Sequence, residues 1–298
     1  MTEMYPQGIR VGGSALPDGV LMLTPMAVAI AREKPDGGFH VTSFALPERK
    51  PHPVEKIPFL RILPKLIGQM GLVVRGWKPG KGKKPPIWLL GAIVVLSVAS
   101  LGLNVVMAGL PTFWHAAGSS LLQLGLFFVL IGATRAFPRV GRIWRFHGGE
   151  HQAIAAYEAG MELTPQNAST RSLYHPRCGT NLATLSIVLM VPGMIVGSLI
   201  TGFLGYLVTI GIPLPSLCVA FEIVMLGQTR IPLVLWPGMA FQRLTVARPD
   251  VRESEAGILA LQAALIEHVK VQAERDAHRQ PAVTPARVVA QMGAHPAE

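Results

Sequence analysis

The chain has 298 residues, of which 50% are hydrophobic and only 15% are charged. Soluble domains usually carry about 25% charged residues, so the composition excludes an ordinary soluble domain. The net charge is +10, but no stacking platform or recognition-helix motif is present, so we predict no nucleic-acid partner. We expect the basic residues to lie beside a lipid bilayer with anionic headgroups.

The N-terminal region, residues 1–54, is predicted to contain a small cytoplasmic β-hairpin. Ala27–Arg32 and Phe39–Phe44 have strand-like composition and flank the turn signal Pro35–Gly38. Two strands alone are marginally stable. We therefore expect the hairpin to pack against another element, such as Arg135–Asn181.

Residues 55–84 are predicted to form an interfacial helix followed by a basic linker. The apolar stretch from Ile57 to Trp77 is interrupted by two prolines, Arg61 and Lys65. This pattern is typical of an amphipathic helix that lies on the membrane surface rather than of a helix that crosses it.

Two long apolar runs, residues 85–134 and 182–229, are each predicted to form a transmembrane hairpin. About 20 apolar residues cross a bilayer, so each run is long enough for two crossings. The second run reverses either near Gly202 or within Gly211–Pro215. The expected helices are Ile87–Leu110, His115–Thr134, Leu182–Ile200 and Phe203–Leu226.

The flanks of these runs predict the orientation in the membrane. Lysines and arginines cluster at residues 75–84, 135–145 and 230–248, whereas the connections near Pro111 and Gly211 carry no charge. The positive-inside rule places all three basic flanks in the cytoplasm. We therefore expect a multi-pass protein of the cell inner (plasma) membrane with both termini cytoplasmic.

The C-terminal part, residues 230–276, is predicted to hold an interfacial segment and then a cytoplasmic amphipathic helix. Ile258, Leu261, Leu265 and Val269 recur at helical spacing between charged residues. Residues 277–298 are rich in proline and alanine, and we expect a disordered tail. The predicted fold class is an α-helical integral membrane protein with about four transmembrane helices.

The segment 135–181 is rich in residues that bind metals. In a helix, His147 and His151 stand at i and i+4 on one face, and two imidazoles at this spacing can share one ion. Glu150 completes an H-x-x-E-H pattern, in which the glutamate acts as a general base. His175 and Cys178 follow, and the four His and Cys side chains would suit zinc.

A structural interpretation of the same residues remains open. Gly148 and Gly149 weaken a helix by about 1 kcal/mol each relative to alanine, so the ligand face depends on what holds this helix together. The histidines and the cysteine are then hydrogen-bonding residues at a turn on the membrane surface.

Glu222 is the only charged residue in the second apolar run. An intramembrane carboxyl indicates a functional site by default, for example one that carries a proton. The alternative is a helix–helix hydrogen bond to Asn104, Gln123 or Thr209.

Several motifs resemble those of the YqhQ-like family, bacterial membrane proteins of unknown function that are often described as metal-dependent enzymes. Asp18 and Gln152 depart from the residues usual in that family. The resemblance implies a metal-dependent activity at the histidine motifs. The matching motifs are Gly12-Gly13, Asp18–Met22, His147–Gln152, His175–Thr180, Phe221-Glu222 and a late stretch from Pro237-Gly238 through Gln242–Thr245 to Pro249-Asp250.

Two functions are therefore considered. In the first, His147, His151, His175 and Cys178 bind zinc and Glu150 is the base of a hydrolase. In the second, the protein is a non-enzymatic scaffold or assembly factor whose cytoplasmic face binds another membrane protein or complex. A transporter that uses Glu222 is a third and weaker hypothesis.

Overall fold

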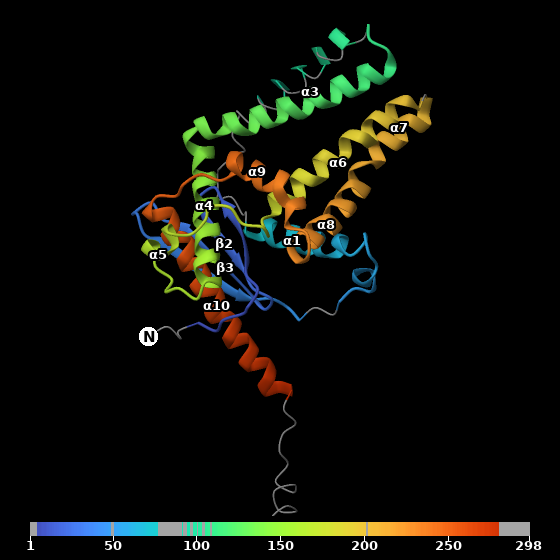
Figure 1. Cartoon of the computed structure of the whole chain (residues 1–298). Coiled ribbons are helices and arrows are strands. Elements are labelled where there is room, and N and C mark those ends of the chain that lie inside the picture. The colour runs from blue at the N-terminus through green and yellow to red at the C-terminus, as the bar shows by residue number, and fades with distance from the viewer. Residues whose placement is uncertain are drawn as a thin grey trace, which may run out of the picture.

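The protein is described by a computed structural model that covers residues 5–48, 51–76 and 91–279, except 92–93, 96–97, 100, 103–104, 108 and 201. It is mostly helical, with a small antiparallel sheet near the N-terminus (Figure 1). The basic linker expected before residue 85 and nearly all of the expected disordered tail lie outside these residues.

The sheet has four strands in the order β1-β2-β3-β4, each antiparallel to the next. The predicted hairpin is confirmed as β3–β4, but β1 and β2 were not predicted. Side chains alternate between the two faces. Val20, Met22, Ala29 and Ala31 pack on one face, and Leu21, Val28 and Ile30 pack on the other. The strands are β1 Gly12–Leu16, β2 Gly19–Leu23, β3 Ala27–Glu33 and β4 Phe39–Ala45.

Two helices, α4 (Pro138–Glu158) and α10 (Val251–Arg279), cover one face of the sheet. Helix α4 lies over β1 and β2, and α10 crosses β2, β3 and β4. The predicted amphipathic helix is confirmed within α10, where Ile258, Leu261 and Leu265 are buried, although Val269 is exposed. The sheet therefore packs mainly on α10 and only in part on the 135–181 segment. The short helix α5 (Pro165–Ser169) contacts both α4 and α10. We call the sheet with α4, α5 and α10 the α/β domain.

Three described helices are long and apolar enough to cross a membrane: Thr112–Ala136, Gly179–Leu199 and Phe203–Thr229. They extend away from the α/β domain on one side (Figure 1). The described residues between 91 and 107, within the first expected span, are helical. The helices of this region are α3 Thr112–Ala133, α6 Gly179–Leu199, α7 Gly202–Gly211 and α8 Pro213–Thr229.

The second apolar run reverses after α6, because α6 packs against both α7 and α8. Of the two boundaries considered, the one near Gly202 is therefore correct. Two further helices are α1 (Ile62–Gly76), within the predicted interfacial stretch, and α9 (Trp236–Thr245), which packs on α6 and α3.

Helix α4 runs without a break through Gly148 and Gly149. The two glycines therefore do not disrupt the helix face that carries His147 and His151. A Cβ atom on Gly148 would lie 2.1 Å from the Ala247 carbonyl oxygen, and one on Gly149 would lie 2.4 Å from the Glu253 carbonyl oxygen. The glycines therefore let the chain around α10 touch the backbone of α4. This packing compensates for their low helix propensity.

Replacement of Gly149 tests this contact. Gly149→Ala should lower the free energy of unfolding by about 1–3 kcal/mol, because the forced separation of two backbones outweighs the gain in helix propensity. Gly125→Ala in α3 is the control, since its Cβ would meet nothing within 4 Å. Thermal unfolding in detergent measures both variants, and equal melting temperatures would contradict the packing role.

Candidate metal centre

Three side chains bring possible ligand atoms together: His147 and His151 from α4, and Cys178 from the turn before α6. Their ligand atoms all lie within 4.8 Å of one another. The imidazole rings have centroids 4.4 Å apart, as expected for positions i and i+4. His147 Nε2 lies 3.3 Å from Cys178 Sγ.

Backbone carbonyls fix the tautomers of both histidines. His147 Nδ1 lies 2.9 Å from the Thr245 carbonyl oxygen, and His151 Nδ1 lies 2.6 Å from that of Leu173. A carbonyl oxygen only accepts hydrogen bonds, so each Nδ1 must carry the proton and donate it. Both Nε2 atoms consequently present lone pairs, which is how metal-binding histidines are usually oriented.

The turn that carries Cys178 is held by buried amides. Gln242 accepts a hydrogen bond from the His175 N–H at 2.9 Å and donates to the His175 carbonyl at 3.0 Å. Asn181 donates to the Pro176 carbonyl at 2.7 Å. A Cβ atom on Gly238 would lie 2.3 Å from the Asn181 side-chain oxygen, so a glycine there lets α9 approach. These residues were not predicted as part of the site, although Gln242 and Gly238 stand in the late family motif.

His175 is placed apart from this group. Its Nε2 lies 3.2 Å from a Glu158 carboxylate oxygen, and its Nδ1 accepts the Arg177 N–H at 3.2 Å. Glu158 also pairs with the Arg177 guanidinium. Both ring nitrogens of His175 thus have protein partners, and the structure assembles three of the four predicted ligands rather than four.

Glu150 points from α4 toward β1. It is 5% exposed, and no described residue offers a hydrogen-bond partner to its Oε2 atom. A Cβ atom on Gly13 would lie 2.8 Å from Glu150 Cγ and from Oε1. Gly13 of the Gly12-Gly13 motif therefore joins the site, because only glycine at this position leaves room for the carboxyl. Asp18, by contrast, forms a salt bridge with Arg32 at 2.8 Å at the hairpin turn.

Burial governs the protonation of these groups. It raises the pKa of Glu150 to about 8. Burial, with the nearby His147, lowers the pKa of His151 to about 3, and burial raises the pKa of Cys178 to about 11. Burial lowers the pKa of His147 as well, so both imidazoles are neutral at pH 7, as metal ligands must be. Cys178 keeps its thiol proton at this pH and would lose it on binding an ion.

The arrangement fits a metal ion on two grounds. The ligand atoms of one tetrahedral zinc ion lie about 3.3–3.7 Å apart, so a small inward movement of these three side chains would complete the geometry. The His151 Nε2 atom is also buried without a hydrogen-bond partner among the described residues. A buried acceptor without a partner is costly, and a cation would satisfy it.

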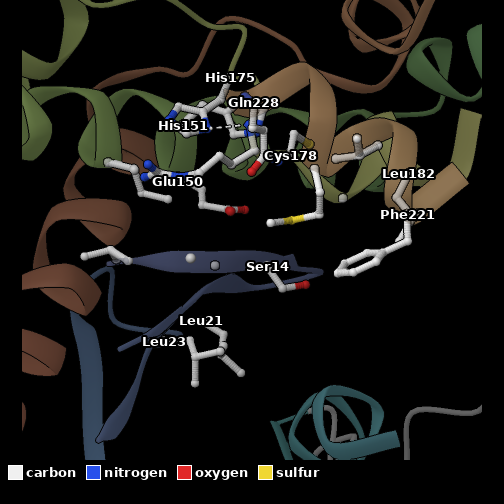
Figure 2. A pocket seen from close by; sticks show the side chains of 18 residues that line it. Ser14, Leu21, Leu23, Glu150, His151, His175, Cys178, Leu182, Phe221 and Gln228 are labelled. Atoms are coloured by element: carbon white, nitrogen blue, oxygen red, sulfur yellow. Dashed lines mark hydrogen bonds between the residues drawn. The ribbon is translucent and has the colours of Figure 1, made fainter. Parts of the chain in front are cut away.

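A cavity of about 350 Å³ opens beside this group. Glu150, His151 and Cys178 line it on one side, and Ser14 and Leu21 of the sheet line it on the other side of β1 (Figure 2). Phe221 of α8 closes another side, as Figure 2 shows. We call this space the junction cavity, because the α/β domain and the apolar helices both line it.

The partners of Glu222 are neither Gln123 nor Thr209 but residues of the segment before α1. Its carboxylate accepts the Arg61 Nε–H at 2.8 Å and the Phe59 N–H at 3.0 Å. A second bond joins Arg61 to its other oxygen. Asn104, the third partner considered, lies outside the described residues. The segment before α1 is thus fastened to α8 by an ion pair.

Fold and site together define a mostly helical protein with three helices apolar enough to span a membrane and a His-His-Cys group next to a cavity. The chain belongs to the family described as "Protein of unknown function (DUF1385)", which matches residues 87–267. This range holds both apolar runs and the three candidate ligands.

A similar protein is "Uncharacterized protein YqhQ" of Bacillus subtilis (strain 168). It is 26% identical over 290 residues, which cover 83% of this chain and 89% of that protein. The resemblance drawn from the motifs is thereby confirmed. No solved structure gives a significant match.

The ion pair at Glu222 can be tested by a double-mutant cycle. Arg61→Ala and Glu222→Gln should each lower stability by about 1–2 kcal/mol, because each leaves a charged or polar partner unsatisfied. The double variant should lose less than the sum of the two. Thermal unfolding in detergent is the measurement, and strict additivity would show that the pair contributes nothing.

Proposed function

We propose that the chain is an integral membrane protein with four crossings whose α/β domain lies in the cytoplasm. The support is a parity argument. The sheet, α4 and α10 pack into one body, so the chain must return to the same side between β4 and α4, and again between α4 and α10. Two crossings before α4 and two after it meet this requirement.

The basic residues agree with this orientation. Arg142 pairs with Glu33, and Arg145 lies 3.1 Å from Glu253 in the α/β domain. Arg135 bonds the Arg243 carbonyl. These cations follow the end of α3 in the chain, where the positive-inside rule expects the cytoplasm.

The proposed activity is zinc-dependent hydrolysis. The observation that carries it is the pair of imidazoles whose Nδ1 protons are fixed by carbonyls, so that both Nε2 atoms converge with Cys178 Sγ. Glu150 lines the same cavity as His151 and Cys178. Catalytic zinc sites have three protein ligands and one open position. When bound, zinc would lower the pKa of a water and polarise the oxygen of a carbonyl or phosphoryl group.

Glu150 is suited to move the proton in this reaction. A buried carboxyl that lines the same cavity as two candidate ligands is placed to exchange a proton with a molecule bound there. It would take a proton from water as the water oxygen bonds to the carbon or phosphorus of the substrate. It would then give that proton to the leaving group as the bond to that group breaks.

The scaffold hypothesis has its own support. A cysteine among the ligands is common in structural zinc sites, and the Cys178 turn is tied to α9 by Gln242 and Asn181. A metal there would fasten α4 to the start of α6 without chemistry. Metal content alone does not separate the two functions, but the behaviour of Glu150 variants does.

The topology gives one prediction. In a background without the two native cysteines, Thr112→Cys at the exposed start of α3 should react with an impermeant maleimide in intact cells. Ser172→Cys, exposed in the α/β domain, should react only after lysis. Both side chains are exposed to solvent, so a difference in labelling reports the side of the membrane on which each one lies. Labelling of Ser172→Cys in intact cells would refute the orientation.

The proposed metal site gives a second prediction. Element analysis of detergent-purified protein should find about one zinc per chain, lost in His147→Ala, His151→Ala and Cys178→Ala. His175→Ala is the matched control and should keep the metal, because both of its ring nitrogens face protein partners. Loss of zinc in His175→Ala would contradict the three-ligand site and support the four-ligand site predicted from the sequence.

The same preparations test catalysis. Glu150→Gln should keep the zinc but reduce the hydrolysis of a p-nitrophenyl acyl ester in micelles by about 10²–10⁴-fold, the usual contribution of a general base. Zinc without any hydrolysis in the wild-type protein would favour the scaffold.

A further inference from the structure

We infer that the junction cavity takes an amphiphile, with its hydrolysable polar end at Glu150 and its acyl chain along α8, admitted from the inner leaflet of the bilayer. This inference rests on the proposed function for the identity of the reacting end. The walls of the cavity carry the argument for the chain.

One wall of the cavity belongs to helices that cross the membrane. Phe221, Val224, Met225 and Gln228 line the cavity, and their spacing of i, i+3, i+4 and i+7 places them on one face of α8. Leu182 of α6 lies beside them in the lining. This wall is apolar except at Gln228, whose position is the nearest to the end of the helix.

The opposite walls carry the polar groups. Glu150, His151 and Cys178 line the α4 side, and Ser14 lines the sheet side. The polar groups therefore gather on the α4 side of the cavity, whereas the α8 wall is apolar and is continued by apolar residues of the α/β domain, such as Leu21 and Leu23. A molecule with one polar and one apolar end matches this division, whereas a small polar metabolite would leave the α8 wall without a partner.

Depth supports access from the bilayer. At 1.5 Å per residue, Phe221 lies about 12 Å along α8 from Thr229, where the helix ends. The headgroup region is about 5–8 Å thick per leaflet. With Thr229 at the membrane surface, Phe221 therefore reaches the level of the acyl chains. On other faces of α8, Val219 and Leu226 are 37% and 39% exposed, as expected of a helix in contact with lipid.

The size of the cavity also matters. A volume of about 350 Å³ is at the lower end of the range of about 300–1,000 Å³ for small-molecule sites. It holds a polar head and the first part of one chain, but not a whole two-chain lipid. The remainder of such a substrate must stay in the bilayer, which an opening along α8 allows.

A photoreactive lipid tests this inference. The protein is reconstituted in vesicles of phosphatidylethanolamine and phosphatidylglycerol that contain a small fraction of phosphatidylglycerol with a diazirine in one acyl chain. After irradiation, mass spectrometry locates the adducts. Lipid around the protein labels the outer faces of the spanning helices, whereas a chain inside the junction cavity lies against the residues of β1 and β2 that line it, among them Ser14, Leu21 and Leu23. We therefore expect adducts within residues 11–23.

Two substitutions that fill the cavity from opposite walls are the test variants. Met225→Trp and Ser14→Trp should abolish adducts within residues 11–23, whereas Leu226→Trp, its neighbour on an outer face of α8, should leave them unchanged. Thermal unfolding identifies a variant that has failed to fold, and the other variant then carries the test. Absence of adducts within residues 11–23 in the wild-type protein, or their persistence in both folded cavity variants, would overturn the inference.

Zinc is measured in the same samples, so that the two proposals fail separately. Adducts that depend on the cavity in a protein without zinc would support the amphiphile and reject the metal. Zinc at one per chain with no adducts within residues 11–23 would reject the amphiphile and leave the metal centre standing.

Discussion

Contact between the backbone of α4 and the start of α10 is the constraint on which the rest of the structure depends. Gly148, Gly149 and Gly257 all stand where a Cβ atom would meet a backbone atom of the other segment. Because the two segments are in contact, Ala247 can donate its N–H to the Trp144 carbonyl at 2.9 Å. The same approach brings the Thr245 carbonyl to His147, so the helix packing fixes the tautomer of a candidate ligand.

Two buried polar atoms of the candidate centre are placed where a ligand could bond to them. Glu150 Oε2 and His151 Nε2 are buried without hydrogen-bond partners among the described residues, and each such atom costs about 1–3 kcal/mol. A protein keeps such groups where binding or chemistry compensates for them. Gln242 shows the contrast. It is fully buried, and it is fully bonded to the turn that it supports.

Much of the fold follows from local sequence patterns. Three features can be recognised from short stretches of sequence: the apolar runs, the β3–β4 hairpin and the helical spacing of apolar residues in α10. The structure contains all three. Strands β1 and β2 gave a weaker signal, since Gly12, Gly13 and Gly19 lower strand propensity. Gly13 and Gly19 are required by contacts with Glu150 and with Ala31, which are distant in sequence, and no local rule finds such contacts.

The site was predictable in its chemistry and less so in its geometry. The i, i+4 spacing brought His147 and His151 together, but spacing could not show that His175 turns toward Glu158. Glu222 gave a sound signal, because a charge in an apolar helix needs a partner. Its partner, Arg61, lies 161 residues away in the sequence. Candidate partners chosen from the apolar helices alone do not include it.

Phe221 and Glu222 are neighbours on α8 and contact different parts of the structure. Glu222 holds the segment before α1, whose exposed Ile57, Phe59 and Leu60 suit a membrane surface. Phe221 faces the junction cavity, and the Arg61 guanidinium lies 5.7 Å from the centre of its ring. The ion pair that anchors the interfacial segment therefore also sets one wall of the cavity. The carboxylate of Glu222 is thus engaged in this anchor, and the candidate metal ligands lie elsewhere, on α4 and in the turn before α6.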